Sequence, residues 1–131
     1  MEGDLSGREI RGPVEARSRE LRVYESPSGK VPFDDWIEGL RDAKGRAQIQ
    51  VRLDRLEQGN LGDCKPVCEG VLELRIKLGP GYRVYFGEDG PLVILLLIGG
   101  DKSTQDKDIK TAKLYWQQYR RDQDERKLQK L

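Results

Sequence analysis

Residues 73–86, "ELRIKLGPGYRVYF", constrain the fold more than any other stretch of this chain. Apolar and polar side chains alternate on both sides of a Gly-Pro-Gly sequence, which is the pattern of strands that bury one face. Glycine and proline together mark a tight turn. The stretch therefore predicts a β-hairpin whose strands are joined by residues 79–81, with its apolar side chains directed toward the core.

The polar face of this hairpin carries basic side chains. The predicted cross-strand pairs are Leu78 with Tyr82, Lys77 with Arg83, and Arg75 with Tyr85. Like charges directly opposite each other cost stability. One interpretation is that Lys77 and Arg83 face an anion that the sequence does not contain. The alternative is a solvated polar face, which is common on exposed strands.

The remaining sequence predicts a single α+β domain over residues 21–121. The predicted elements are a strand at 21–24, helices at 31–40 and 43–60, strands at 71–78, 82–87 and 91–98, and a last helix opened by residues 103–108. This order, β-α-α-β-β-β-α, groups the strands and segregates the helices to one side. The apolar run at 92–98 belongs inside the sheet rather than at its edge.

The two ends and the loop at 61–70 are predicted to lie outside this core. Residues 1–20 are polar and interrupted by Gly and Pro, which is typical of a disordered extension. Residues 122–131 are charged and predicted to form a helical tail that frays. No secretory signal or membrane-spanning run is present, and two cysteines indicate a reducing compartment, so we expect a cytoplasmic protein.

Charge and residue usage exclude several function classes. The formal net charge is +1, so any nucleic-acid site must be local. The chain has no histidine, which removes the usual metal ligand and the usual general base near neutral pH. Cys64 and Cys68 alone cannot complete a zinc site, and two ordinary loop thiols are favoured over a redox switch. We therefore expect no metal and no cofactor.

Two segments, 62–86 ("GDCKPVCEGVLELRIKLGPGYRVYF") and 98–116 ("IGGDKSTQDKDIKTAKLYW"), resemble the RelE/ParE superfamily of bacterial toxins. Within it, they are most similar to the HigB-like, phage-derived addiction-module killer proteins. The resemblance covers about residues 21–119. It implies a RelE-like, small, antiparallel-rich sheet packed against helices. It also implies a ribosome-dependent endoribonuclease that cuts mRNA in the decoding site and is neutralised by a cognate antitoxin, of the helix-turn-helix type.

The resemblance also implies site residues. Carried over by position, the catalytic residues are Arg75, Lys77, Arg83 and Lys102. The family's C-terminal aromatic or histidine has no clear counterpart, and Asp108 and Ile109 fall near its place. Tyr85, Arg52 and Arg55 are the expected RNA-binding residues. For the arginines of the second helix, a solvated face is the alternative, whereas the aromatic residues Trp36, Tyr115, Trp116 and Tyr119 are expected to belong to the core.

RNA cleavage of this kind needs a deprotonated 2′-hydroxyl, a stabilised phosphorane and a protonated 5′-oxygen. Guanidinium groups suit the phosphate because they bind it bidentately. A lysine acts as a base only when its pKa falls well below about 10.4, and neighbouring cations push it that way. The candidate is Lys77, with Glu73 or Glu69 as the less favoured alternative. Tyr85 could stack on a base or donate a proton.

Two rival functions fit the same fold. A non-catalytic toxin would bind a protein target such as gyrase, and an inactive prophage remnant would retain antitoxin binding alone. The outward basic cluster favours the nuclease, since a protein binder has no need for it.

Overall fold

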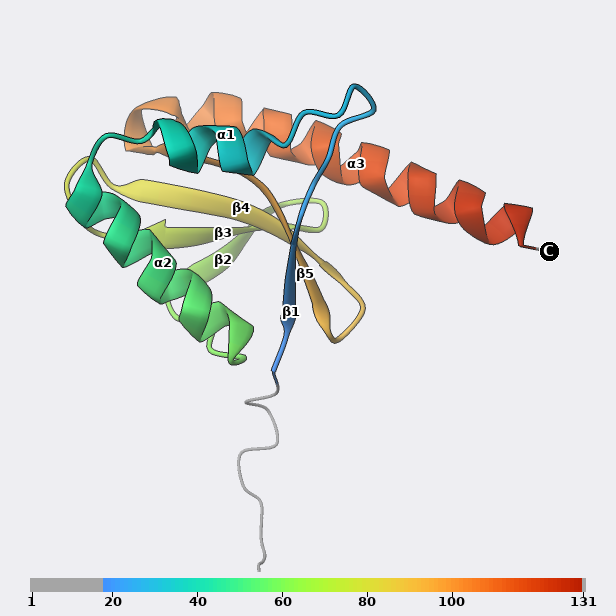
Figure 1. Ribbon diagram of the computed structural model, residues 1–131, viewed down its shortest axis with the longest axis horizontal. Coiled ribbons are helices and arrows are strands. Elements are labelled where there is room, and N and C mark those ends of the chain that lie inside the picture. The colour runs from blue at the N-terminus through green and yellow to red at the C-terminus, as the bar shows by residue number, and fades with distance from the viewer. Residues whose placement is uncertain (1–17, 131) are drawn as a thin grey trace, which may run out of the picture.

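The computed structural model describes residues 18–130, which form an α+β fold with a five-stranded sheet (Figure 1). The elements are β1 (Glu20–Val23), α1 (Pro32–Gly39), α2 (Ala43–Glu57), β2 (Cys64–Cys68), β3 (Val71–Ile76), β4 (Tyr82–Asp89), β5 (Val93–Asp101), the 3₁₀ helix η1 (Lys102–Thr104) and α3 (Gln105–Gln129). The strand order is β1-β5-β4-β3-β2; β1 pairs parallel with β5, and the β5–β4, β4–β3 and β3–β2 pairs are antiparallel. The predicted fold class is confirmed, and β5 lies inside the sheet as expected.

The structure adds one strand to the predicted order. Residues 61–70 were expected to form a loop, but β2 pairs antiparallel with β3 at the edge of the sheet. Pro66 stands in the middle of β2, and the register shifts between Pro66 and Cys68. Proline cannot donate to a sheet ladder and is therefore confined to edges and irregular positions, which is where β2 places it.

The first strand begins slightly earlier than predicted. The backbone N–H of Arg19 donates to the carbonyl of Glu57 at 2.7 Å, and the Arg19 side chain pairs with Glu88 at 2.8 Å. β1 starts at Glu20, so the predicted extension, which ended at residue 20, overlaps this strand by one residue. The rest of that prediction concerns residues 1–17, which lie outside the described residues.

Helices cover both faces of the sheet, which corrects the expectation that they lie to one side. One apolar cluster packs the sheet against α1 and α2, and its buried members include Phe33, Ile49, Leu74 and Phe86. The second cluster packs the opposite face against α3 through Trp116 and other residues. The polar side chains of β3 and β4 therefore lie on the α3 face rather than in open solvent.

The long helix α3 runs past the sheet, and its C-terminal end projects away from it (Figure 1). The tail predicted to fray is helical as far as Gln129. Of the four aromatic residues expected in the core, Trp116 is buried, and Trp36, Tyr115 and Tyr119 pack partly buried against the two clusters. The core assignment of these residues is confirmed. In the described part of the chain, no helix is long and apolar enough to cross a membrane.

Candidate functional site: a cationic pocket beside the hairpin turn

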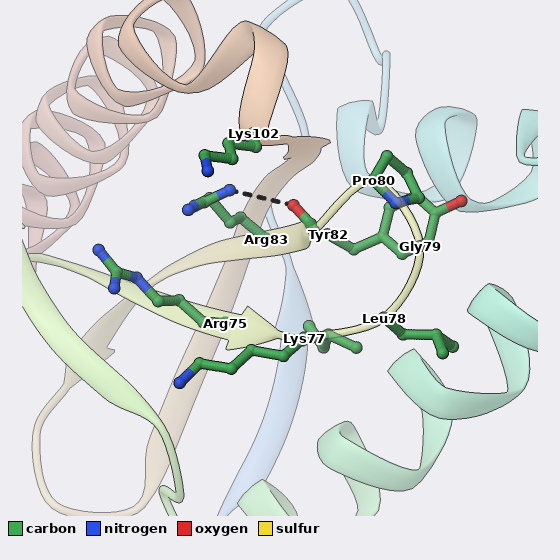
Figure 2. Close-up of a pocket in the computed structure, with 10 residues that line it drawn as sticks. Arg75, Lys77, Leu78, Gly79, Pro80, Tyr82, Arg83 and Lys102 are labelled. Carbon is green, nitrogen blue, oxygen red and sulfur yellow. Dashed lines mark hydrogen bonds between the residues drawn. The ribbon is translucent and has the colours of Figure 1, made fainter.

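A pocket of about 420 Å³ opens beside the turn between β3 and β4 (Figure 2). Its charged lining residues are Arg75, Lys77, Arg83 and Lys102. Ile76 and residues 78–82 complete the lining, so no carboxylate of the described residues contributes to it. The four residues predicted to be catalytic are therefore brought to one place by three separate segments: β3 with the turn, β4, and η1.

The register of the hairpin differs from the prediction. Ile76 pairs with Tyr82, so Arg75 lies opposite Arg83, and Lys77 leaves the ladder. β3 ends at Ile76 and β4 begins at Tyr82, so the connection spans residues 77–81. Within it, the N–H of Gly81 donates to the carbonyl of Leu78 at 3.0 Å and closes the turn. Gly81 adopts a φ of 76°, which favours glycine. The predicted Lys77–Arg83, Leu78–Tyr82 and Arg75–Tyr85 pairs are therefore wrong.

Two contacts fix this turn to the helices. The Tyr82 hydroxyl donates to Oδ2 of Asp42 at 2.7 Å, and Asp42 also caps α2 by accepting from the N–H of Gly45 at 3.0 Å. On the other side, the backbone N–H of Lys102 lies 3.4 Å from the carbonyl of Pro80. The turn is thus held between α2 and η1, and the position of Lys102 at the pocket follows from the second contact.

A buried carboxylate lies behind the two arginines. Glu73 has no exposed surface, and its Oε1 accepts a hydrogen bond from Nε of Arg75 at 2.8 Å. Its Oε2 accepts from the Tyr85 hydroxyl at 3.0 Å and from Nε2 of Gln105 at 2.9 Å. The same Oε2 lies 3.5 Å from Nε of Arg83. Glu73 is therefore surrounded by hydrogen-bond donors from β3, β4 and α3.

These donors decide the charge of Glu73. Burial by itself raises the pKa of a carboxyl group, but the hydrogen bonds from Arg75, Gln105 and Tyr85, together with the charge of Arg83, hold the pKa of Glu73 below its ordinary value. The group is ionised at neutral pH.

Neither carboxylate considered as a base can play that part in the pocket. Glu73 has no exposed surface and its oxygens are engaged, so it cannot reach a substrate. Glu69 is exposed between β2 and β3, where it lies 4.0 Å from Nζ of Lys113 and does not line the pocket.

Tyr85 is buried rather than presented to RNA. It lies directly opposite Glu73 in the sheet and has no exposed surface. Burial, followed by the hydrogen bond to Glu73, raises the pKa of Tyr85. The prediction that Tyr85 stacks on a base is wrong, because its ring belongs to the core beneath α3.

The two lysines lie at the rim. The Lys77 side chain is 83% exposed, and its Nζ is 3.6 Å from Oδ2 of Asp63. Lys77 is predicted to be the base because Arg75 flanks it and Arg83 faces it, but Arg83 pairs with Arg75 instead. Lys102 begins η1 and is exposed; Asp101 caps this turn by accepting from the N–H of Ser103 at 2.8 Å.

The arginines of α2 have separate positions. Arg52 lies behind the pocket, where its guanidinium donates to the backbone carbonyl of Arg75 and, at 3.4 Å each, to those of Leu61 and Asp63. These bonds attach α2 to β3, so Arg52 acts in the fold. Arg55 is exposed on α2, and its assignment as an RNA-binding residue stays a prediction.

Sequence reasoning missed the roles of Glu73 and Gln105. Residues two apart on a strand share a face, so the spacing of Glu73 and Arg75 could have indicated their contact. No comparable local signal connects Gln105 to this site, because 32 positions separate it from Glu73. Elsewhere in residues 18–130, no group of three or more His, Cys, Asp or Glu side chains is placed to hold a metal ion.

In amino-acid sequence, the chain is similar to an uncharacterized protein of Haemophilus influenzae. The two are 51% identical over 88 residues, which is 67% of this chain and 89% of the Haemophilus protein. No family model matches the chain. Identity at this level across most of the relative shows common descent, and the chain therefore belongs to the same family as this Haemophilus influenzae protein.

Proposed function

We propose that this protein is the toxin of a type II toxin-antitoxin system, and that it is a metal-independent, ribosome-dependent endoribonuclease that cleaves mRNA. The observation that carries the proposal is the pairing of Arg75 and Arg83 in a pocket shared with Lys77 and Lys102 and lined by no carboxylate of the described residues. Guanidinium groups suit a scissile phosphate because they can bind two of its oxygens at once. The resemblance of the hairpin and of the segment after β5 to RelE/ParE toxins supports the same reaction.

The chemistry follows from the charges. Attack of the 2′-oxygen on phosphorus adds negative charge to the non-bridging oxygens, and the guanidinium groups of Arg75 and Arg83 are placed to stabilise it. Lys77 and Lys102 at the rim attract the flanking phosphates and can serve proton transfer to the 5′-oxygen. Since the pocket lining offers no carboxylate base, deprotonation of the 2′-hydroxyl falls to a lysine or to a group of the ribosome-bound substrate.

The proposal includes a partner and a place of action. A helix-turn-helix antitoxin would neutralise the protein by laying acidic groups over the cationic pocket or by displacing α3, and the site of action is the cytoplasmic ribosome. A toxin that binds a protein such as gyrase, or an inactive remnant, remains the alternative. The nuclease is favoured because a pair of guanidinium groups, Arg83 nearly buried and Arg75 partly buried, serves a phosphate better than a protein surface.

Two substitutions test the nuclease site. Arg83→Ala removes a phosphate donor and should reduce cleavage about 10²- to 10³-fold. Arg83→Lys should restore only part of the activity, because an ammonium group cannot bind two oxygens at once. Arg83 is nearly buried beside Glu73, so its loss should also lower the melting temperature. Lys102→Ala is the cleaner variant because Lys102 is exposed, and it should reduce cleavage with little change in stability.

The assay is ribosome-dependent cleavage of a defined mRNA by purified protein, mapped by primer extension, with thermal melts of each variant. Arg22→Ala is the control, since Arg22 is an exposed arginine on β1 outside the pocket. Full cleavage by folded Arg83→Ala and Lys102→Ala variants would exclude this site. Absence of cleavage by the wild-type protein would favour the protein-binding toxin or the remnant.

A further inference from the structure

We propose that Glu73 is the positioning residue of the cationic pocket: its buried carboxylate fixes the guanidinium groups of Arg75 and Arg83 so that their outer nitrogens face an incoming anion. The inference rests on the proposed function only in taking that anion to be an RNA phosphate. Glu73 itself has no exposed surface and does not touch the ligand.

The contacts use the inner edge of both guanidinium groups. Nε of Arg75 donates to Glu73 at 2.8 Å, and Nε of Arg83 faces the other carboxylate oxygen at 3.5 Å. Among the described residues, the outer nitrogens of Arg75 have no hydrogen-bond partner, and Arg83 uses Nη1 to donate to the carbonyl of Gly81 at 3.0 Å. Figure 2 shows both side chains directed to the same side of the hairpin. Both outer nitrogens of Arg75, together with Nη2 of Arg83, are therefore left available to an anion.

Arg83 adds a second observation. Its Nε is buried and lacks a hydrogen-bond partner among residues 18–130, although Oε2 of Glu73 lies 3.5 Å away. Buried donors are normally satisfied. A small shift of the guanidinium toward Glu73 would complete this bond, and an anion that seats Arg83 from its outer edge would favour that shift.

Glu73 is itself held in one orientation. Tyr85 and Gln105 both donate to Oε2, and Arg75 donates to Oε1. Every group that faces the carboxylate is thus a donor, so a glutamine at this position would direct its own N–H groups at other donors. An ionised carboxylate, which the lowered pKa of Glu73 maintains, is the acceptor that fits.

Charge alone argues against a carboxylate at this position. Glu73 is the anion that contacts the arginines behind four cations, and it reduces the positive field that attracts a ligand. Coulomb's law therefore predicts that Glu73→Gln binds an anion more tightly than the wild type. Positioning predicts the opposite, since the two guanidinium groups lose their fixed orientation. The two explanations differ in the sign of the effect.

The experiment is a titration of the full-length protein with inorganic phosphate, followed by the ¹⁵N–¹H signals of the arginine Nε–Hε groups. In the wild type, the Arg75 Nε–Hε should exchange slowly with water, and the Arg75 and Arg83 signals should move on phosphate addition. In Glu73→Gln, the Arg75 proton should lose this protection, and phosphate affinity should fall at least tenfold. Affinity equal to or above that of the wild type would overturn the proposal.

The chain offers a matched control and two milder variants. Arg22 Nε contacts Oε2 of Glu20 at 2.6 Å, again two residues apart on a strand but exposed, so Glu20→Gln should leave phosphate affinity unchanged. Tyr85→Phe and Gln105→Ala each remove one bond to Glu73 and keep the carboxylate, and each should weaken phosphate binding about threefold. If Glu73→Gln does not fold, unchanged affinity in both milder variants would refute the proposal.

The same titration separates this inference from the nuclease proposal, since it contains no ribosome and no RNA. Glu73-dependent phosphate binding by a protein that cuts no mRNA would support the positioning role and refute the nuclease.

Discussion

Gly99→Ala should destabilise the protein, because this glycine makes room for a tryptophan. A Cβ at Gly99 in β5 would lie 2.2 Å from Cε3 and Cζ3 of Trp36, the residue that α1 packs on the sheet. Carbon atoms in contact lie about 3.5 to 4.0 Å apart, so the indole would have to retreat by about 1.5 Å. It has little space, since its ring centroid lies 5.8 Å from that of Phe33 and 6.3 Å from that of Tyr82.

The magnitude follows from two opposing effects. Overpacking of this kind costs about 1 to 3 kcal/mol. Replacing glycine by alanine lowers the entropy of the unfolded chain and returns about 0.4 to 1 kcal/mol. A net loss of about 1 to 2 kcal/mol should lower the melting temperature by roughly 4 to 8 °C for a domain of this size.

The assay is thermal unfolding followed by circular dichroism and tryptophan fluorescence. Gly39→Ala is the matched control: this glycine ends α1, and an added Cβ would meet no atom within 4 Å. It should unfold at or slightly above the wild-type temperature. Trp36→Ala should cost less in the Gly99→Ala background than in the wild type, because the clash is then removed. A Gly99→Ala protein as stable as Gly39→Ala would refute the packing argument.

Two further predictions concern titrating groups. Cys64 and Cys68 lie four strand residues apart, about 13 Å, and pack against opposite faces of the sheet. A disulfide needs Cα atoms within about 7 Å, so diamide treatment should produce no intramolecular disulfide detectable by mass spectrometry. Burial raises the pKa of Cys64 to about 11, so alkylation of this thiol should be at least tenfold slower than that of an exposed thiol. The pKa of Glu73 is lower in the folded protein than in the unfolded chain. Ionised Glu73 therefore stabilises the fold at a pH above the ordinary pKa of glutamate, and this stabilisation is lost as the pH falls through the pKa of Glu73 in the folded protein. Burial raises the pKa of Asp108, so ionised Asp108 destabilises the fold, and this cost is relieved as the pH falls. Between pH 7 and pH 3, the urea midpoint of unfolding should therefore fall less steeply for Glu73→Gln, and more steeply for Asp108→Asn, than for the wild type.

The hairpin shows what alternation in a sequence can and cannot determine. A slip of two residues leaves every side chain on its original face, because the period of a strand is two. The pattern at 73–86 therefore assigned the faces correctly, with Leu74 and Ile76 toward the core and Arg75 and Arg83 on the other side. It could not distinguish a Lys77–Arg83 pair from the Arg75–Arg83 pair that forms. That choice depends on where the turn closes, at Leu78 and Gly81.

The sequence contains one indication that a second helical layer, formed by α3, covers the sheet. Residues 92–98 are apolar at every position, and such a strand is typical of a sheet covered on both faces. The run predicts that β5 lies inside the sheet, and it also indicates a second helical layer. The strand β2 had no such signal, since Pro66 and the irregular pairing around it obscure any alternation. The contact between Gln105 and Glu73 depends on how α3 docks, which no local pattern encodes.

The like charges of the hairpin have a physical explanation in Glu73. Arg75 and Arg83 face each other directly, an arrangement that is destabilising on an open sheet surface. Glu73 belongs to the next cross-strand pair on the same face of the sheet. Its two oxygens face the two arginines, and this attraction offsets their repulsion within the fold. A solvated polar face needs no such arrangement, and the full burial of Glu73 and Tyr85 contradicts that interpretation. Because Glu73 contacts only Nε of each guanidinium, it offsets the repulsion and leaves the outer nitrogens of Arg75 and Nη2 of Arg83 for the pocket. An anion with several oxygens around one atom, as in a phosphate, can bind both arginines at once, whereas a single carboxylate from a protein partner has one oxygen for each.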